Sequence, residues 1–435
     1  MQIWNRETEC QDRNDLAQLQ LERLQSTLNR AYKNVPFYHN CLGEACVDPS
    51  AVKSLADLAQ LPLTSREDLS KNYPYGLFAV PLRDIVRIHS ATGTGSNPTV
   101  SGYTNKDLGI WTEMVARALT AAGVIAEDII QICFDPGLAN WARDFKGGAE
   151  AVQASVIPMT QLEIPKQVMV MNDYKTSVLV TTPSYARQLL REISQMGINP
   201  NVLSLRRALL LGESMSARSR SGLEEALRIQ IQTGYGLSEV PGPAIAYECR
   251  ERQGLHINED HFIAEIIDPE TGQQLPPGES GELVLTTLTA KAFPLIRFRT
   301  GDRARLTVES CPCNRSFARL EAIQGRADQL VVIRGIKLHP QLIHGIMSRL
   351  GQGRLPAYVG FVRRLEDLDL LEVWMRVDEV HFSDEIKVLE HLVHRVRLEL
   401  EQSLGIPARV RLVEPGTMVL YEDRLGQILD ERANG

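Results

Sequence analysis

A stretch rich in small hydroxyl residues and glycines, IHSATGTGSNPTVSGYT at residues 88–104, has the composition of a phosphate-binding turn. Glycines let the backbone approach an anion closely, and free N–H groups and hydroxyls supply hydrogen-bond donors. Apolar, β-branched runs flank the stretch, which is unusual for a linker. No Gly-Lys-Ser/Thr follows, so the stretch is not a Walker A loop. The residues alone leave two interpretations open, a phosphate-binding turn and a flexible hairpin.

Four soft side chains in the second half of the chain have the chemistry of metal ligands. Cys249 lies seven residues before His256, and Cys311 and Cys313 form a Cys-Pro-Cys sequence some fifty residues later. Three thiolates and one imidazole are typical of structural zinc, because four protein ligands leave no open position. This spacing is not diagnostic, so the alternative is four unconnected residues with reduced thiols. The nearby alternative ligands are Asp260 and His261.

The composition of the whole chain excludes several classes of protein. Its 435 residues are enough for two or three domains. The net charge of −7 argues against a nucleic-acid-binding surface, which normally carries a basic field. No run of about 18 apolar residues occurs and the N-terminus is polar, so we expect neither a membrane span nor a secretory signal. Seven scattered cysteines do not indicate a disulfide framework, and we expect a cytoplasmic protein.

The elements that must position these residues alternate between residues 105 and 330. Helical stretches such as 109–123 and 183–197 are interleaved with short apolar runs typical of buried strands. This alternation predicts a parallel sheet covered by helices on both faces. Residues 262–310 contain Pro- and Gly-rich turns between β-type runs, which predicts antiparallel hairpins or a small barrel. The residues after 330 predict a compact α+β domain.

Seven short motifs resemble, in order and spacing, the phenylacetate–coenzyme A ligase branch of the adenylate-forming superfamily. The resemblance covers nearly the whole chain. It implies an α/β fold with a large N-terminal domain (residues 1–327) of parallel-type sheets, helices and a small β-subdomain, followed by a small, mobile α+β C-terminal domain (residues 328–435). The motifs are SATGTGSNPT (90–99), TGYGLSEVPGP (233–243), ECRERQGLHINEDHF (248–262), RFRTGDRARL (297–306), CPCNRSFARL (311–320), GRADQLVVIRG (325–335) and VEPGT (413–417).

The resemblance implies an enzyme that uses ATP and Mg²⁺ to convert a carboxylic acid, here expected to be aromatic, to an acyl-adenylate. The acyl group then passes to the thiol of coenzyme A. Joining two anions requires charge neutralisation and alignment more than proton transfer. We expect a homodimer that binds small molecules and neither nucleic acid nor membrane. The alternatives are an adenylate-forming enzyme that delivers to a carrier protein or an amine, and a nucleotide-binding homologue without catalysis.

The resemblance also implies roles for individual residues. Tyr235 is expected to stack on adenine, Ser238 to lie near the α-phosphate, and Glu239 to hold magnesium as a catalytic residue. Asp302 would accept hydrogen bonds from both ribose hydroxyls, and Arg326 would reach the same ribose or a phosphate. The other residues expected to bind the nucleotide are Thr92, Gly93, Thr94, Gly95, Ser96, Gly212, Glu213 and Gly236. Some members of the branch carry the same cysteine–histidine cluster, which favours zinc.

Two positions depart from the family pattern, and both concern cations near the phosphates. Asn97 replaces the lysine that usually precedes Pro-Thr, and Arg424 replaces the catalytic lysine near the C-terminus. Arginine keeps the charge but is planar and bulkier, so Arg424 is the expected catalytic cation. Lys337 is an alternative source of charge. Asp328 is expected to be the hinge about which the C-terminal domain rotates between the two half-reactions.

The segment expected to form the acyl pocket, FDPGLANWARDFKGG (134–148), is bulkier and more charged than the Gly-rich segment of the family. Phe134, Trp141 and Arg143 are expected to line this pocket. A salt bridge from Arg143 or Lys146 would favour a polar acid over plain phenylacetate. The sequence does not determine which acid is used, which acceptor follows, or whether the loss of both lysines leaves full activity.

Overall fold

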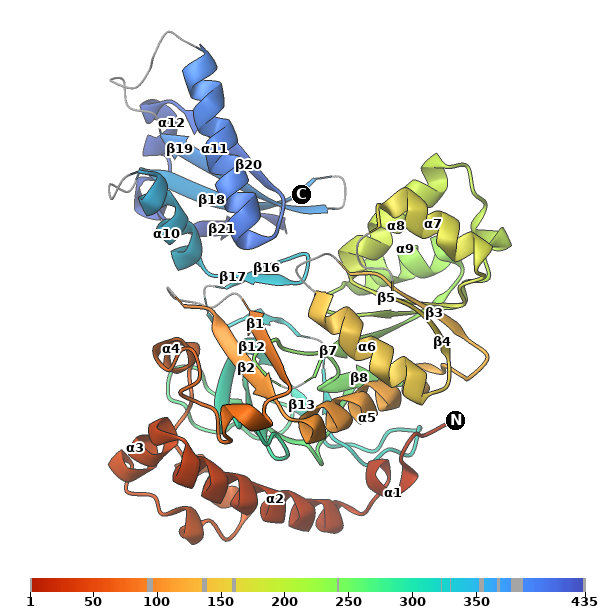
Figure 1. Cartoon of the computed structure of the whole chain (residues 1–435), viewed down its shortest axis with the longest axis vertical. Helices are drawn as coiled ribbons and strands as arrows, with labels where there is room; N and C mark the ends of the chain where they lie inside the picture. The colour runs from red at the N-terminus through yellow and green to blue at the C-terminus, as the bar shows by residue number, and fades with distance from the viewer. Residues whose placement is uncertain are drawn as a thin grey trace.

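The computed structural model describes residues 2–91, 97–134, 139–158, 162–240, 242–321, 323–328, 330–351, 356–365, 368–376 and 386–432. Its helices are α1 (Arg6–Glu9), α2 (Arg13–Asn34), α3 (Pro36–Glu44), α4 (Arg66–Lys71), α5 (Asn105–Ala122), α6 (Ala139–Ala151), α7 (Ile164–Asp173), α8 (Pro183–Gln195), α9 (Ala217–Leu227), α10 (Pro340–Leu350), α11 (Ile386–Leu404) and α12 (Pro415–Val419). In Figure 1, a blue C-terminal part stands at one end of the long axis, and α2 and α3 lie at the other.

The strands form three larger sheets and two hairpins. They are β1 (Arg87–Ala91), β2 (Thr99–Tyr103), β3 (Ile129–Ile132), β4 (Ser155–Pro158), β5 (Val178–Thr181), β6 (Arg207–Leu210), β7 (Gln230–Tyr235), β8 (Ala246–Glu248), β9 (Leu255–Ile257), β10 (Phe262–Ile267), β11 (Gly281–Thr287), β12 (Phe298–Ala304), β13 (Leu306–Thr307), β14 (Arg319–Leu320), β15 (Gly325–Arg326), β16 (Val331–Ile333), β17 (Ile336–Leu338), β18 (Tyr358–Leu365), β19 (Leu368–Arg376), β20 (Ala408–Val413) and β21 (Ile428–Asp430).

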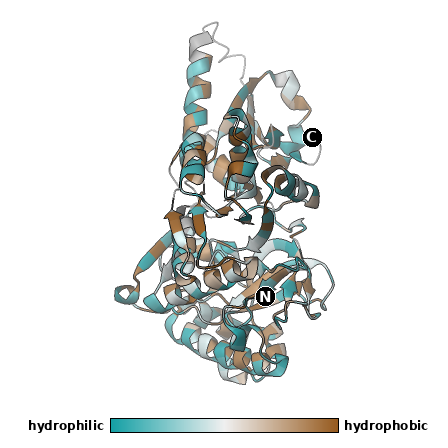
Figure 2. Cartoon of the chain, turned by 90° about the vertical axis from the view of Figure 1, so that its right-hand side faces the viewer, coloured by the Kyte–Doolittle hydropathy of each residue, from teal (hydrophilic) through white to brown (hydrophobic). Residues whose placement is uncertain are grey.

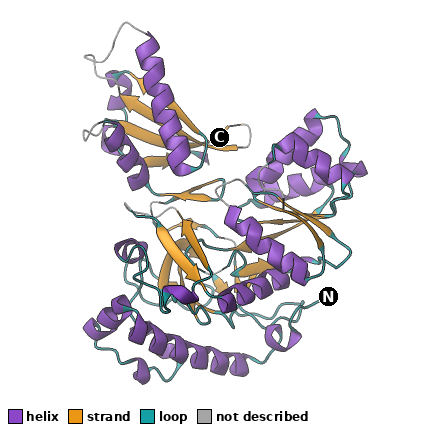
Figure 3. Cartoon of the chain, in the orientation of Figure 1, coloured by secondary structure: helices purple, strands orange, loops and turns teal. Residues whose placement is uncertain are grey.

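The predicted parallel sheet is confirmed as five strands in the order β4-β3-β5-β6-β7. Alternate residues of β6 and its extension pack on opposite faces. Leu209 and Leu211 join the core beneath α5 and α6, whereas Ala208 and Leu210 join the core beneath α7, α8 and α9. Figure 3 shows purple helices on both sides of these strands. In such a doubly wound sheet, ligands bind at the carboxyl ends of the strands.

The large sheet continues beyond β7 through four short antiparallel strands, in the order β8-β9-β14-β13. The sequence did not predict this extension, because strands of two or three residues are too short to show a periodic pattern. The extension brings the loop between β13 and β14 next to β8 and β9. Motifs about sixty residues apart in the chain therefore meet.

The predicted antiparallel hairpins are confirmed as a second sheet, β10-β11-β12-β15. Its apolar side packs against the N-terminal helices, since Leu24 and Leu28 of α2 share one core with Leu283 and Leu285 of β11. Two strands of this sheet carry predicted site residues. Asp302 of β12 and Arg326 of β15 are direct cross-strand partners.

The C-terminal part has its own sheet, in the order β20-β19-β18-β21, and its own hydrophobic core. Among the described residues, that core is built from positions between Val331 and Ile428. Figure 2 shows teal and brown segments alternating along the tall helix α11, whose apolar side faces this core. The hairpin β16-β17 lies between this sheet and the rest of the chain (Figure 1).

Candidate active site and metal centre

Three residues with predicted roles at the ribose and adenine lie together beside the end of β7. The Tyr235 hydroxyl donates to Asp302 Oδ2 at 2.6 Å, and Arg326 Nη1 donates to Asp302 Oδ1. Burial, followed by the negative charge of Asp302, raises the pKa of Tyr235 well above its ordinary value. The phenol is therefore neutral and remains a donor. A carboxylate offers about four acceptor sites, so Asp302 retains capacity for two further donors such as vicinal hydroxyls.

The predicted hinge residue, Asp328, is bound by the same arginine. Arg326 donates from Nε to Asp328 Oδ1 and from Nη2 to Asp328 Oδ2, both at 2.6 Å. Burial opposes ionisation of Asp328, but Arg326 and then Arg66 overcome this effect and hold its pKa below the ordinary value. Arg326 thus connects the predicted ribose ligand to the predicted hinge.

Arg66, at the start of α4, belongs to this cluster although no sequence motif indicated it. Its Nε donates to Glu239 Oε1 at 2.9 Å, and its Nη1 donates to Asp328 Oδ2 at 3.1 Å. The only local signal was a helix start, in which Ser65 and Asp68 form a capping box. That pattern predicts that a helix begins at Arg66, but it does not predict which residues the Arg66 side chain contacts.

Two predicted glycines disfavour a side chain, Gly236 for lack of space and Gly212 because of its left-handed backbone conformation. A Cβ on Gly236 would come within 2.5 Å of the backbone oxygen of Pro243. Gly212 has φ +86°, and a Cβ there would lie 3.4 Å from the Trp141 ring and 3.6 Å from Gly335 Cα. The turn of the β16-β17 hairpin, from the C-terminal part, therefore lies against the end of β6. Ser238 is half-buried in the loop after β7.

Glu213, next to Gly212, is held by the start of α8. Its carboxylate accepts hydrogen bonds from the Ser184 backbone N–H at 3.0 Å and from the Ser184 hydroxyl at 2.5 Å. Burial raises the pKa of Glu213, and these hydrogen bonds oppose the increase. Sequence analysis did not indicate Ser184.

The expected phosphate donors Thr92, Gly93, Thr94, Gly95 and Ser96 lie outside the described residues. The strands on either side, β1 and β2, pair as an antiparallel hairpin. Asn97, which follows the turn, donates from Nδ2 to the Ser70 backbone oxygen at 3.3 Å. Asn97 thus contacts the end of α4, the helix that begins with Arg66.

The expected acyl-pocket residues divide into buried and exposed ones. Phe134 and Trp141 are buried, with ring centroids 6.2 Å apart in an edge-to-face arrangement. Arg143 is exposed, and Lys146 pairs with Glu150 at 2.5 Å along the surface of α6. Among the described residues of this segment, the buried polar one is Asp144, a charged residue to which the sequence analysis assigned no role.

Asp144 is buried on α6 and accepts a hydrogen bond from Arg87 Nη1 at 2.7 Å. Burial raises its pKa to about 7, although the charges of Arg87 and Arg143 act in the opposite direction. The neighbouring His89, on β1, has its pKa lowered to about 4 by burial, then by Arg87 and Arg143. The two groups are therefore displaced from their ordinary pKa values in opposite directions.

Arg424 is exposed in a short 3₁₀ helix (Glu422–Arg424) of the C-terminal part. Among the described residues, no ion pair or side-chain hydrogen bond links it to Tyr235, Glu239 or Asp302. This arrangement therefore does not bring the expected catalytic cation to the other site residues. The side chain of Lys337, the alternative cation, lies outside the described residues.

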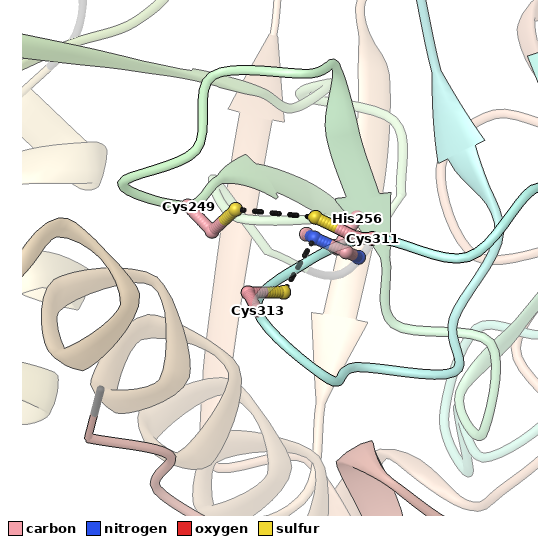
Figure 4. Close-up of side chains that lie close together, drawn as sticks. All are labelled: Cys249, His256, Cys311 and Cys313. Carbon is pink, nitrogen blue, oxygen red and sulfur yellow. Dashed lines mark hydrogen bonds between the residues drawn. The ribbon is translucent and has the colours of Figure 1, made fainter.

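The four soft side chains gather in one buried cluster, drawn in Figure 4. Their ligand atoms all lie within 4.8 Å of one another. The Cys249 and Cys311 sulfurs are 3.8 Å apart, and Cys313 Sγ is 3.3 Å from His256 Nε2. Tetrahedral zinc with Zn–S bonds of about 2.3 Å has S···S edges of about 3.8 Å, so the spacing suits that ion.

Neighbouring groups orient the cluster for a metal. His256 Nδ1 lies 3.4 Å from the Phe317 carbonyl oxygen, an acceptor that would keep the proton on Nδ1 and leave Nε2 facing the sulfurs. The alternative ligands are engaged elsewhere, since Asp260 pairs with Arg117 at 2.8 Å and His261 Nδ1 is 2.9 Å from Thr289 Oγ1. The cluster of Cys249, His256, Cys311 and Cys313 is therefore the set that the fold assembles.

A separate surface pocket of about 490 Å³ is lined by Gln230, Gln232, Arg250, Glu251 and Arg252. It lies beyond the amino end of β7, so it is remote from the cluster around Asp302 at the other end of that strand. No predicted site residue lines it. Among the described residues, no helix is both long and apolar enough to cross a membrane.

Comparison with known proteins identifies the class of enzyme. Residues 148–289 match the AMP-binding enzyme family, and residues 335–432 match the AMP-binding enzyme C-terminal domain. The chain is 38% identical to the phenylacetate–coenzyme A ligase of Thermus thermophilus, over 99% of this chain and 100% of that one. It is 36% identical to the enzyme of the same name from Escherichia coli, over 96% and 95% of the two chains.

The chain therefore belongs to the phenylacetate–coenzyme A ligase family of AMP-binding enzymes. It is an AMP-forming acid–thiol ligase, which activates a carboxylic acid with ATP and transfers the acyl group to coenzyme A. The α/β fold and the function implied by the sequence motifs are both confirmed at this level.

The structural neighbours distinguish between arrangements of the two parts of the chain. A 2-hydroxyisobutyryl-CoA ligase in its thioesterification state, with 2-HIB-AMP and CoA, matches with a TM-score of 0.90 at 25% identity, over 98% of this chain and 92% of that one. The same ligase in its postadenylation state matches with a TM-score of 0.72 at 24% identity, over 99% and 93%. The arrangement described here is thus closer to the former.

Proposed function

We propose that the chain activates an aromatic carboxylic acid and that the cluster around Asp302 holds the nucleotide. The observation that carries the proposal is the convergence of Tyr235, Asp302 and Arg326, with Glu239 joined to the same cluster through Arg66. In this proposal Asp302 binds the ribose, Tyr235 stacks on adenine, and Arg326 neutralises charge. The turn 92–96 and the residues Gly212, Glu213, Gly236 and Ser238 complete the nucleotide site.

The names of the relatives support phenylacetate or a closely related arylacetate as the acid. The buried rings of Phe134 and Trp141 support an aromatic acyl group. Trp141 lies beside Gly212, a proposed nucleotide-site residue that also lies beside the β16-β17 turn. Arg143 remains a proposed pocket residue at the exposed side of α6.

Glu239 suits Mg²⁺, because it is a buried carboxylate and Mg²⁺ prefers oxygen ligands. A bound Mg²⁺ would neutralise phosphate charge. Glu239 would hold the ion, and the backbone of the turn 92–96 would align the phosphates with the attacking carboxylate. Catalysis by the chain would then consist of positioning and electrostatic stabilisation.

The proposed domains are residues 1–327 and 328–435, with Asp328 as the hinge between them. The separate core of the C-terminal part supports this division. The contact between Gly212 and Gly335 and the TM-score of 0.90 support the thioester-forming arrangement for this structure. In this proposal, rotation about Asp328 brings Arg424 to the phosphates for adenylation. A homodimer and a cytoplasmic location are further proposals, supported only by the sequence.

We also propose that the cluster of Cys249, His256, Cys311 and Cys313 binds one structural zinc ion. The support is the tetrahedral spacing of four buried soft ligands. Such an ion would hold the loop between β13 and β14 against β8 and β9 and thereby stabilise the end of the large sheet.

The experiment that tests the proposed function is a panel of carboxylic acids incubated with ATP and Mg²⁺, with and without coenzyme A. Pyrophosphate release measures activation, and thioester formation identifies the acceptor. Arylacetates should give the highest rates, and thioester should form only with coenzyme A. Nucleotide binding without pyrophosphate release from any acid would favour a homologue that has lost catalysis.

A further inference from the structure

Arg66 connects three segments that are distant in the sequence. Besides Glu239 and Asp328, it donates from Nη2 to the Thr300 backbone oxygen at 2.6 Å, so all three guanidinium nitrogens are used. The side chain is only 9% exposed and lies over the ring of Phe298. A planar, fork-shaped guanidinium can hold three acceptors in fixed directions, which a lysine cannot do.

The backbone just before Arg66 is held by hydrogen bonds. Thr64, two residues earlier, makes two backbone hydrogen bonds with the start of β12. Its N–H donates to the Arg297 oxygen at 3.0 Å, and its oxygen accepts from the Arg299 N–H at 2.9 Å. Ser65 then caps α4, and its N–H donates to Asp68 Oδ2 at 2.8 Å. The side chain of Arg66 therefore starts from a fixed point on the N-terminal part.

The partly exposed carboxylate of Asp328 accepts hydrogen bonds from both sides of the proposed hinge, mostly from arginines of the N-terminal part. Its Oδ2 accepts from both Arg66 and Arg326, and its Oδ1 accepts from Arg326 and from the Leu330 N–H at 3.2 Å. A Cβ on Gly301 would overlap Asp328 Oδ2, so the carboxylate packs directly on the strand backbone. The Ala327 N–H donates to the Gly301 oxygen at 2.7 Å.

We propose that Arg66 is a positioning residue that ties the hinge Asp328 to the loop of Glu239 and so favours the thioester-forming arrangement. The inference rests on the proposed function for the roles of Asp328 and Glu239. Rotation about Asp328 would carry the Leu330 N–H away from the carboxylate that Arg66 holds, so a fixed carboxylate favours the arrangement described here. Arg66 also donates to Oε1 of Glu239, so the same guanidinium holds the loop after β7, while a carboxylate offers further acceptor sites to a metal ion.

The first test uses full-length, ligand-free protein and needs no substrate. Hydrogen exchange is compared between wild type, Arg66→Gln and Arg66→Lys, for peptides covering residues 327–338. We expect exchange of the Ala327 and Leu330 amides to become several-fold faster in Arg66→Gln. Arg66→Lys should be intermediate, because an ammonium can pair with Glu239 or Asp328 but cannot span both. Arg206→Gln, which breaks an ion pair with the buried Asp128 just before β3 of the parallel sheet, is the matched control and should not change exchange there.

The second test separates the two half-reactions with the arylacetate that gives the best rate. Arg66→Gln should slow transfer from preformed acyl-adenylate to coenzyme A about tenfold more than it slows pyrophosphate release, and Arg66→Lys should recover part of the loss. Unchanged exchange at residues 327–338 in Arg66→Gln overturns the proposal, as does equal slowing of both half-reactions. Failure of the wild type to activate any acid refutes the proposed function instead, and the exchange result is unaffected by it. Thermal unfolding of each variant verifies that it is folded.

Discussion

The hydroxyl oxygen of Tyr235 lies 2.6 Å from Asp302 Oδ2, although 67 residues separate the two in the sequence. The contact fixes the aromatic ring and the carboxylate relative to each other at the end of β7. A ring that binds a purine and a carboxylate that binds a vicinal diol must keep such a fixed separation. In the proposed nucleotide site, this hydrogen bond would hold both groups in position before a nucleoside binds.

Replacement of Asp302 by alanine should weaken binding of AMP and ATP. The variant removes the proposed ribose acceptor and also leaves Tyr235 and Arg326 without their carboxylate. Hydrogen bonds to charged groups contribute about 1.5–3 kcal/mol, so we expect roughly a 10–100-fold higher Kd by calorimetry. Asp268→Ala, at a turn after β10, is the control and should bind normally. Unchanged nucleotide affinity in Asp302→Ala would remove the assignment.

Arg424→Ala should slow pyrophosphate release, whereas Arg424→Lys should leave it intact or raise it. Negative charge develops on phosphate oxygens as the acyl carboxylate attacks, and a nearby cation lowers the barrier. By analogy with a lost oxyanion-hole donor, alanine should cost roughly 10²–10³ in rate. Because Arg424 is exposed here and, among the described residues, no hydrogen bond or ion pair links it to Tyr235, Glu239 or Asp302, transfer from preformed acyl-adenylate to coenzyme A should be unaffected. If alanine matches wild type in pyrophosphate release, Arg424 is not the catalytic cation.

Purified protein should contain about one zinc per chain, measured by mass spectrometry of the metal. Cys313→Ser should lose the ion and lower the Tm, because structural zinc contributes directly to folding free energy. Cys46→Ser, at an exposed cysteine, should retain the ion and the Tm of wild type. Metal-free wild type with an unchanged Tm would show that the cluster is a set of reduced thiols and a histidine.

Asp144 should give the fold a specific pH dependence. Its folded pKa of about 7 lies above the ordinary carboxyl value, so the unfolded chain releases this proton at lower pH than the folded chain does. The contribution of Asp144 to stability therefore falls as pH rises from about 4 to about 7 and is constant above that. Since a pKa difference of one corresponds to about 1.4 kcal/mol, the change is at most about 4 kcal/mol.

Asp144→Asn should remove that dependence, so its free energy of unfolding relative to wild type should rise with pH over the same window. Denaturant unfolding at a series of pH values measures this difference. His89 contributes with the opposite sign in both proteins, because its lowered pKa reduces stability as pH falls from about 6.5 to about 4. A difference between variant and wild type that does not change with pH would show that Asp144 ionises normally.

Much of the fold was predictable because its elements have strong local patterns. The apolar runs that became β3, β5 and β6 are largely buried, and the intervening helices are amphipathic, so their alternation indicated the parallel sheet. The short strands β8, β9, β13 and β14 were not predicted. They exist because they pair with one another in the folded chain, and a run of two or three residues carries too little pattern of its own.

The sequence by itself determined the types of residue available for chemistry, since motif order identified Tyr235, Asp302, Arg326 and the four metal ligands as candidates. Only the tertiary structure decided which side chains meet. Arg66 joins Glu239 to Asp328 and Asp144 pairs with Arg87 through contacts between segments far apart in the chain, whereas Arg143 faces solvent one residue away from Asp144. Side-chain direction depends on how helices and strands pack, and packing is a property of the whole fold rather than of any short stretch.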